Sequence, residues 1–305
     1  MPYENRLNHV MNGKRRKEVN MDNIREKGYV IVVTYNRKEK LEKCIDCLLN
    51  QTYSISKILI IDNASTDGTD IFLKQISKQY PSIFYYRNKE NEGGAGGFDK
   101  GIRLAYEEGA DWIWGMDDDA FPEKNALYNL LSCRSENSLK DAYWSNPNND
   151  MDFEKSIKYV NSWMFVGFFL TREIVQSIGF PRKDFFIYYD DYEYADRIIA
   201  NGFNIWKVKD SVIKHQDAAS NKRCIYLGNI KKEVILLPEQ KWKTYYLVRN
   251  DLLRHAQKDR RYYQTIFRNI RRIIKAILFC PNQLGIVIKG FYHGLTGKSG
   301  KRVLP

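Results

Sequence analysis

Apolar runs and helical patterns alternate along the first part of the chain, and this alternation constrains the fold more than any other feature. Residues 29–35 and 57–62 are continuous β-branched runs, as in strands buried on both faces of a parallel sheet. The predicted strands are 29–35, 57–62, 83–87 and 112–116, and the predicted helices are 38–50, 65–79 (capped by Ser65 or Thr66) and 98–108. This order predicts an open α/β fold with a mostly parallel sheet, flanked by helices, that binds ligands beyond the carboxyl ends of its strands.

The remaining sequence shows looser patterns. The predicted elements are short aromatic-rich strands within 159–169, a helix at 191–201, strands at 204–209 and 212–216, and helices at 236–253 and 262–279. Residues 1–27 are polar and form a lead-in to which we assign no chemistry. Residues 1–13 lack the apolar segment of a secretion signal, and no apolar stretch reaches the roughly 18 residues of a spanning helix. We therefore expect a cytoplasmic protein.

The net charge of +12 is concentrated in the C-terminal tail. Residues 240–305 hold fifteen Lys and Arg and two acidic residues, a net charge of +13, which leaves −1 for the rest. Helix 262–279 has an apolar face of Ile266, Ile270, Ile273, Ile274, Ile277 and Leu278, and a basic face of Arg268, Arg271, Arg272 and Lys275. A near-neutral body with a cationic amphipathic tail favours docking at a membrane surface over binding of nucleic acid. The alternative is a solvated helix that packs on the body.

The pair Cys44 and Cys47 forms a CxxC motif, which can bind zinc or undergo redox chemistry. No second pair lies at zinc spacing, and Cys44 falls on the apolar helix face of Leu41, Ile45 and Leu48. The pattern therefore predicts core packing for this pair.

Three consecutive carboxylates, Asp117, Asp118 and Asp119, follow the predicted strand 112–116. They repel one another unless a cation compensates them, and hard oxygen ligands suit Mg²⁺ or Mn²⁺. Alternate side chains of an extended turn point the same way, so we expect Asp117 and Asp119 to share a site while Asp118 points elsewhere. The alternative is a solvated acidic turn.

A glycine-rich segment at 91–97 follows the third predicted strand and opens into the helix expected from Phe98. Glycine permits close approach of a ligand, and a helix N-terminus supplies oriented N–H donors, so the segment predicts contacts to a diphosphate. It matches neither the Walker pattern nor the dinucleotide fingerprint. The alternative is a flexible loop.

Acidic residues also begin the predicted helix 191–201, where Asp190 and Asp191 follow the aromatic segment 185–189. One of them can serve as a general base for an incoming hydroxyl, although acids in this position also favour the helix dipole. His215 is a candidate third metal ligand or a structural histidine. Trp163 and Phe165 share one face in the strand expected there, and an exposed indole suits stacking on a sugar ring, with core packing as the alternative.

Four segments together resemble the family-2 inverting glycosyltransferases of the GT-A fold. They are Val32-Val-Thr-Tyr-Asn-Arg37, Ile61-Asp-Asn-Ala-Ser-Thr-Asp67, the glycine-rich 91–97 and Met116-Asp-Asp-Asp119. The glycine-rich segment followed by three Asp is similar to the galactofuranosyltransferase and rhamnosyltransferase branch. The later Tyr245-Tyr-Leu-Val-Arg-Asn250 also resembles that branch. The similarity runs from about residue 28 to residue 217.

The resemblance implies a role for each matching residue. The implied donor-binding residues are Thr34, Arg37, Asp62, Asn63, Asn91, Gly93, Gly94, Gly96, Gly97 and Asp118. The implied metal ligands for Mn²⁺ or Mg²⁺ are Asp117, Asp119 and His215, and Asp191 is the implied catalytic base. The implied acceptor-binding residues are Trp163, Tyr189 and Asp190. Tyr189 stands where the family often has Trp, and Met164 follows a single Trp163, which leaves the acceptor open.

The resemblance also implies a division of the chain and a reaction. Residues 28–235 are the expected GT-A catalytic domain, with a nucleotide-sugar half at 28–120 and an acceptor half at 121–235, and residues 236–305 are the basic helical tail. The expected reaction transfers galactofuranose from UDP-galactofuranose to a lipid-linked or growing cell-surface polysaccharide, such as a capsule or O-antigen, beside the inner face of the membrane. The alternatives are transfer of rhamnose from dTDP-rhamnose, an inactive nucleotide-sugar-binding protein, and nucleic-acid binding by the tail. An oligomer is possible.

Overall fold

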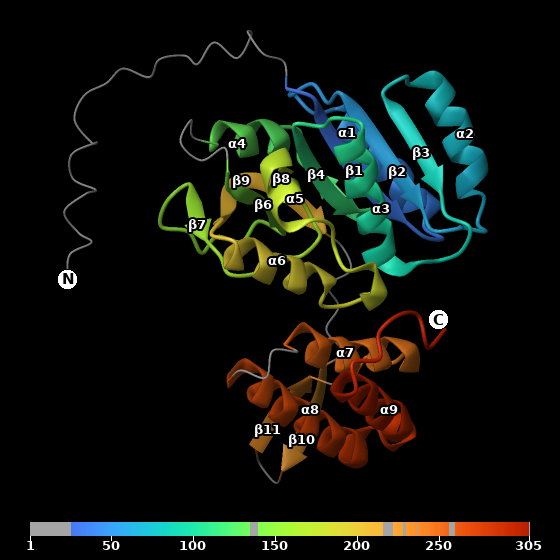
Figure 1. Cartoon of the computed structure of the whole chain (residues 1–305), viewed down its shortest axis with the longest axis vertical. Helices are drawn as coiled ribbons and strands as arrows, with labels where there is room; N and C mark the ends of the chain where they lie inside the picture. The colour runs from blue at the N-terminus through green and yellow to red at the C-terminus, as the bar shows by residue number, and fades with distance from the viewer. Residues whose placement is uncertain are drawn as a thin grey trace, which may run out of the picture.

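The computed structural model describes residues 26–134, 140–215, 222–227, 230–235, 237–255 and 260–304. Figure 1 shows two lobes, and the C-terminal segment returns to the junction between them. We call residues 26–215 the sheet lobe and residues 222–304 the helical lobe. Of the predicted lead-in at 1–27, residues 1–25 lie outside the described residues.

Four parallel strands form the first half of the sheet, as predicted. They are β1 (Gly28–Thr34), β2 (Lys57–Asp62), β3 (Ile83–Arg87) and β4 (Trp112–Asp117), in the spatial order β3-β2-β1-β4. The register pairs Thr34 with Asp62 and Val33 with Asp117. The carboxyl ends of β1, β2 and β4 therefore lie together at one edge, and the predicted α/β class is confirmed.

The second half of the sheet is mixed. It contains β8 (Phe168–Thr171), β6 (Ala142–Pro147), β9 (Ile205–His215) and β5 (Ala120–Pro122), with β7 (Ile157–Tyr159) paired to β9. Short strands were expected within 159–169, and only the ends of this range are strand, in β7 and β8; residues 160–167 form no strand, and Gly167 has a φ of +74°. The strands predicted at 204–209 and 212–216 form the single strand β9, since a register shift in β6 between Trp144 and Asn146 lets the pairing continue.

Helices cover both faces of the sheet (Figure 1). They are α1 (Lys38–Leu49), α2 (Thr69–Gln79), α3 (Gly93–Glu107), α4 (Ala126–Ser132), α5 (Arg172–Ile178) and α6 (Asp190–Ala200). Val30 and Val32 of β1 pack in the core with α1, α2 and α4, whereas Ile31 and Val33 pack in the core with α3, α5 and α6. Cys44 is fully buried in the first of these cores, as the apolar face of α1 predicted.

Two helices begin at residues other than the predicted ones. Helix α3 begins at Gly93 instead of Phe98, because its glycines allow close packing on the sheet. A Cβ atom at Gly97 would lie 2.4 Å from Cγ1 of Val33, and such a contact excludes any side chain there. Helix α2 begins at Thr69, whose backbone amide donates to Asp67, so neither Ser65 nor Thr66 caps it.

The helical lobe contains α7 (Lys241–Arg254), α8 (Arg260–Phe279), α9 (Leu284–Leu295) and a hairpin of β10 (Lys222–Leu227) and β11 (Ile230–Ile235). Two of these helices were predicted, whereas α9 and the hairpin were not. Gly290 and Gly294 let α9 approach α7 closely, since a Cβ at Gly290 would lie 2.8 Å from the carbonyl oxygen of Tyr245. In the part of the chain that the structure describes, no helix combines the length and apolar character needed to cross a bilayer.

Candidate active site

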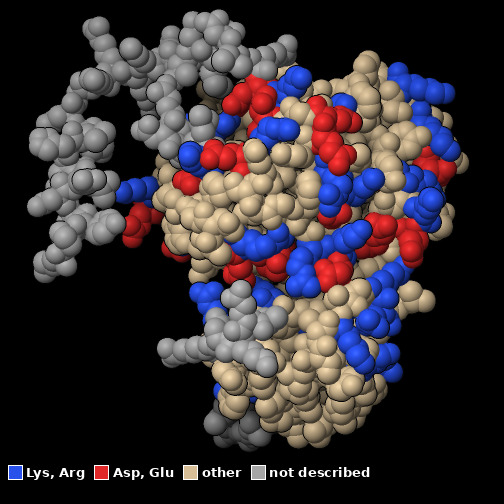
Figure 2. All heavy atoms as spheres, viewed as in Figure 1, with Lys and Arg blue, Asp and Glu red and all other residues tan. Residues whose placement is uncertain are grey.

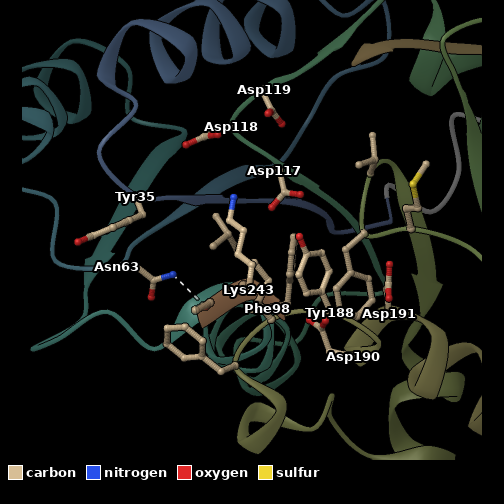
Figure 3. A pocket seen from close by; sticks show the side chains of 18 of the residues that line it. Tyr35, Asn63, Phe98, Asp117, Asp118, Asp119, Tyr188, Asp190, Asp191 and Lys243 are labelled. Carbon is tan, nitrogen blue, oxygen red and sulfur yellow. Dashed lines mark hydrogen bonds between the residues drawn. The ribbon is translucent and has the colours of Figure 1, made fainter. Parts of the chain in front are cut away.

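A cavity of about 720 Å³ lies at the carboxyl edge of β1, β2 and β4. Figure 3 shows acidic side chains around it from two directions, after β4 and at the start of α6. The predicted site residues that line it are Thr34, Arg37, Asn63, Asn91, Gly93, Gly94, Asp117, Asp118, Asp119, Tyr189, Asp190, Asp191 and His215. Residues from strands and helices far apart in the sequence therefore meet in one cavity, as expected from the fold.

The three acids after β4 have different partners. Asp118 is buried and accepts hydrogen bonds from Oγ1 of Thr34 (2.7 Å) and from Arg37 (3.2 Å), and burial raises its pKa to about 6. Asp119 accepts a bond of 2.7 Å from Arg37. Burial, and then the charges of Asp119 and Asp118, raise the pKa of Asp117 well above its ordinary value. Burial and mutual repulsion therefore disfavour the fully ionised state of Asp117 and Asp118.

Asp119 and His215 fit the requirements of a divalent cation. Oδ1 of Asp119 is buried and pairs with Nε2 of His215 at 3.2 Å, and no other described group bonds this oxygen. Two neighbouring ligands of one octahedral ion, each at about 2.1 Å, lie roughly 3 Å apart. Across the described ranges, no three His, Cys, Asp or Glu side chains form a metal-binding cluster, so Asp117 does not join this pair. A cation here would also relieve the mutual repulsion of the three acids.

The glycine-rich turn is less open to a ligand than the sequence predicts. The backbone amide of Gly93 donates to Oδ1 of Asn91, and that of Ala95 donates to the carbonyl of Phe186. Asn63, whose Nδ2 donates to the carbonyl of Gly93, connects this turn to the end of β2. These two amides therefore serve the fold and are not free to bind a diphosphate.

Three residues that the resemblance assigns to the donor do not line the cavity. Asp62 is fully buried, and its carboxylate accepts hydrogen bonds from Arg87 (2.8 Å) and from the amide of Ser65 (2.9 Å). Gly96 and Gly97 lie inside α3, where a Cβ would collide with Glu92 and Val33 respectively. The structure assigns these three residues to packing and to the conformation of the loop after β2.

Asp190 and Asp191 begin helix α6 on the other side of the cavity (Figure 3). Burial raises the pKa of Asp190 to about 7, and burial with the charge of Asp190 raises the pKa of Asp191 well above its ordinary value. A carboxylate with a raised pKa is a stronger base, which suits removal of a proton from a hydroxyl group. The preceding Phe186, Tyr188 and Tyr189 all have positive φ, between 65° and 67°, which strains this loop.

Trp163 does not present an exposed indole, contrary to the prediction. The side chain is 1% exposed and packs with Phe168 at 5.7 Å between ring centroids. Its Nε1 donates a hydrogen bond of 3.1 Å to the backbone carbonyl of Asp191. The alternation argument failed because residues 160–167 are not a strand, and the indole of Trp163 bonds the backbone of Asp191.

Helix α7 also lines the cavity, through Trp242, Lys243 and Leu247. Figure 3 shows the amino group of Lys243 directed into the space between the acids. Lys243 was not predicted as a site residue. It carries no recognisable motif, and residues 236–305 were expected to form a separate tail. The similarity of residues 245–250 to a branch of the family was the one signal that this helix belongs to the site.

A second cavity of about 500 Å³ adjoins the first and shares Met164 and Tyr192 with it. Trp144 and Tyr159 line it, together with polar groups from Asp150 and Asn161. Aromatic rings beside hydrogen-bonding groups are a surface on which a sugar can bind. Asp191 lines the first cavity, and two residues close to it, Tyr192 and Trp163, line the second.

The chain is similar to a known protein family over about half of its length. The model of the family described as "Glycosyl transferase family 2" matches residues 29–188. This range covers the parallel half of the sheet and extends to the residue before Tyr189. It therefore contains the acids after β4 and the loop that leads to α6.

Similar curated proteins come from bacteria and archaea. Galactofuranosyltransferase GlfT1 of Mycobacterium tuberculosis is 24% identical over 249 residues, which cover 74% of this chain and 81% of that protein. Glycosyltransferase AglE of Haloferax volcanii is 25% identical over 203 residues, 61% of this chain and 66% of that protein.

Solved structures share the fold. Mannosyltransferase PcManGT from Pyrobaculum calidifontis, in complex with GDP-Man and Mn²⁺, aligns with a TM-score of 0.58 at 18% identity over 90% of this chain and 76% of that chain. S. aureus TarS 1–349 in complex with UDP-GlcNAc aligns with a TM-score of 0.55 at 15% identity over 88% and 81%. The predicted GT-A fold is confirmed by these neighbours.

Proposed function

Because the chain belongs to glycosyl transferase family 2, we propose that it transfers galactofuranose from UDP-galactofuranose to a hydroxyl group of a lipid-linked or growing cell-surface polysaccharide. The observation that supports this proposal most strongly is that the acids after β4 and the pair Asp190 and Asp191 line the same cavity. The similarity to galactofuranosyltransferase GlfT1 over 74% of this chain supports the choice of sugar.

The proposed reaction is a single displacement with inversion at the anomeric carbon. Asp191 removes the proton from the acceptor hydroxyl, and the oxygen attacks the anomeric carbon from the face opposite the nucleotide. The bond from that carbon to the diphosphate breaks as the new bond forms. Asp190 raises the basicity of its neighbour through its charge, and Trp163 holds the backbone of Asp191 in place.

Asp119 and His215 would hold a divalent cation, Mn²⁺ or Mg²⁺, with the carboxylate of Asp117 near the same part of the cavity. Bound there, the cation would neutralise charge that develops on the departing diphosphate. The solved neighbour PcManGT contains Mn²⁺, which supports the use of a divalent cation. Thr34 and Arg37 hold Asp118 and Asp119 in position for this role.

The first test is release of nucleoside diphosphate from a panel of UDP-, dTDP- and GDP-sugars, with a lipid-like galactoside or rhamnoside acceptor. We expect turnover of UDP-galactofuranose that requires Mn²⁺ or Mg²⁺ and stops with EDTA. Turnover of dTDP-rhamnose alone would keep the mechanism and replace the donor. The proposed chemistry fails if metal-supplemented enzyme transfers no sugar from any donor, which would favour an inactive nucleotide-sugar-binding protein.

We also propose that the helical lobe docks the enzyme on the inner face of an anionic membrane. On the inward side of α8, Arg268, Asn269 and Arg272 donate hydrogen bonds to the fully buried Asp251. Its apolar side is exposed, as is one side of α9. The exposed residues are Tyr263, Phe267, Ile270, Ile274, Ile277 and Leu278 of α8, and Ile288, Tyr292 and Leu295 of α9.

Charge favours lipid as the occupant of this apolar surface. Figure 2 shows uncharged surface with Lys and Arg at its edges on the visible face of the helical lobe. Among the described residues of this lobe from Leu237 onward, Glu239 is the one exposed acid. Cationic side chains attract anionic headgroups and repel a second copy of the same lobe. The proposed membrane-binding surface is therefore the exposed apolar side of α8 and α9 with the Lys and Arg side chains at its edges.

Flotation with phosphatidylglycerol and phosphatidylcholine vesicles tests this surface. Burying a Phe or Ile side chain contributes about 1.5–3 kcal/mol, so the double variant Phe267→Ser with Ile274→Ser is expected to bind at least roughly tenfold more weakly. The matched control is Ile71→Ser with Tyr128→Ser in the sheet lobe. The control side chains are 59% and 51% exposed, against 57% and 49% for Phe267 and Ile274. Equal flotation of both double variants contradicts the docking surface.

A further inference from the structure

The loop that carries the proposed base is held from the helical lobe. It joins the 3₁₀ turn Lys183–Phe185 to α6 and contains the three residues of positive φ, Phe186, Tyr188 and Tyr189. Bulky residues adopt this conformation only where their surroundings enforce it. The next residues are Asp190 and Asp191, so any relaxation of the loop moves these carboxylates.

A single side chain of α7 bonds three backbone carbonyls of the segment 185–188. Asn250 is fully buried, and its Nδ2 donates to the carbonyls of Phe185 (2.8 Å), Ile187 (2.8 Å) and Tyr188 (2.9 Å). Because one amide nitrogen bonds three backbone carbonyls, it restricts the backbone conformation of the loop. The loop therefore curves around Asn250.

Arg249 fixes the orientation of that amide. Its Nε donates to Oδ1 of Asn250 (2.8 Å), which turns Nδ2 toward the loop. Its Nη2 donates to the carbonyls of Asp184 (3.1 Å) and Phe185 (3.0 Å). Its Nη1 donates to the carbonyl of Gly300, whose own amide donates to the carbonyl of Asp184. The C-terminal segment thus completes the support of the loop.

The opposite side of the loop contacts the glycine-rich turn. The carbonyl of Phe186 accepts a hydrogen bond of 3.1 Å from the amide of Ala95. A Cβ at Gly93 would lie 2.0 Å from that carbonyl oxygen, so glycine is required for this approach. The loop is therefore enclosed between α3 of the sheet lobe and α7 of the helical lobe.

From these contacts we infer that Asn250, oriented by Arg249, is a positioning residue for the catalytic base. It does not line the cavity, and it acts by fixing the strained loop that leads into Asp190 and Asp191. This inference rests on the proposed role of Asp191 as base. It also makes the helical lobe a part of the catalytic centre, beyond its proposed contact with the membrane.

The test separates positioning from general stability by comparing two buried amides of the same lobe in the full-length enzyme. Asn250→Ala is expected to lower kcat by roughly 100-fold, because small displacements of a catalytic group have effects of this size. Affinity for UDP with Mn²⁺, measured by calorimetry, is expected to stay the same. The control Gln283→Ala removes a buried amide that bonds Thr244 and Pro238 and does not contact the loop, so kcat should be retained.

Arg249→Lys provides a second variant, which decides the question if Asn250→Ala does not fold. It keeps the charge but removes the fork that bonds Asn250 and the loop together, so a smaller loss of kcat with unchanged UDP affinity is expected. Unchanged kcat in a folded variant overturns the inference, as does a loss of kcat that Gln283→Ala reproduces. Absence of transfer by the unmodified enzyme would instead count against the proposed function.

Discussion

Replacing Asp191 with Asn is expected to abolish sugar transfer while nucleotide binding persists. The amide cannot accept the proton of the acceptor hydroxyl, and loss of a general base lowers a rate by roughly 10²–10⁴-fold. Asp191 begins α6 on the opposite side of the cavity from Thr34 and Asn63, so the nucleotide contacts should survive. The measurement is kcat for transfer together with the dissociation constant for UDP in the presence of Mn²⁺.

The control for this variant is Asp70→Asn. Asp70 is an acid in the first turn of α2, as Asp191 is in the first turn of α6, but it does not line the cavity. If Asp191 served only the helix dipole, the two variants would both lose a little stability and keep transfer. Near-normal transfer by Asp191→Asn would remove this residue from the role of base.

Replacing Asp119 with Asn is expected to remove the dependence of nucleotide binding on the metal. Asp119 pairs with His215 at 3.2 Å through its buried Oδ1, and no other group in the described part of the chain bonds this oxygen. Losing one of few ligands should weaken Mn²⁺-dependent UDP binding by at least roughly tenfold. Calorimetric titration of UDP with Mn²⁺ and with EDTA measures the effect.

Asp111→Asn serves as the control for the Asp119 variant. Asp111 lies just before β4, at the end of the strand away from the cavity, where it accepts a hydrogen bond from the amide of Lys27. Its replacement should leave the metal dependence unchanged. If the Asp119 variant binds UDP in the presence of Mn²⁺ as tightly as the unmodified enzyme does, Asp119 is not a ligand of the metal.

The sequence predicted the parallel half of the sheet and the acidic edge of the cavity well. Continuous apolar runs are typical of strands buried on both faces, and parallel strands bring their carboxyl ends to one edge. Thr34 and Asp117 therefore had to lie close together once the strands were recognised. The class of fold and the position of the acids after β4 follow from this local information.

Other features depend on contacts that no local pattern reveals. Glycine is a poor helix former, so residues 93–97 were expected to be a loop, yet the approach of α3 to Val33 requires glycine within a helix. The periodicity of α8 predicted its two faces but not which of them is buried. That choice depends on Asp251, a buried carboxylate on another helix that requires the arginines of α8.

Helix α7 has a consequence for how enzymes of this architecture can diverge or be engineered. A chimaera that joined this sheet lobe to helices from another protein would lose Lys243 from the cavity and the side chains that enclose the 184–188 backbone. Substrate range and catalytic geometry would then change together, even if both parts folded. The useful unit of exchange is therefore the whole of residues 26–304, and variation in specificity is better sought in single side chains such as those around the second cavity.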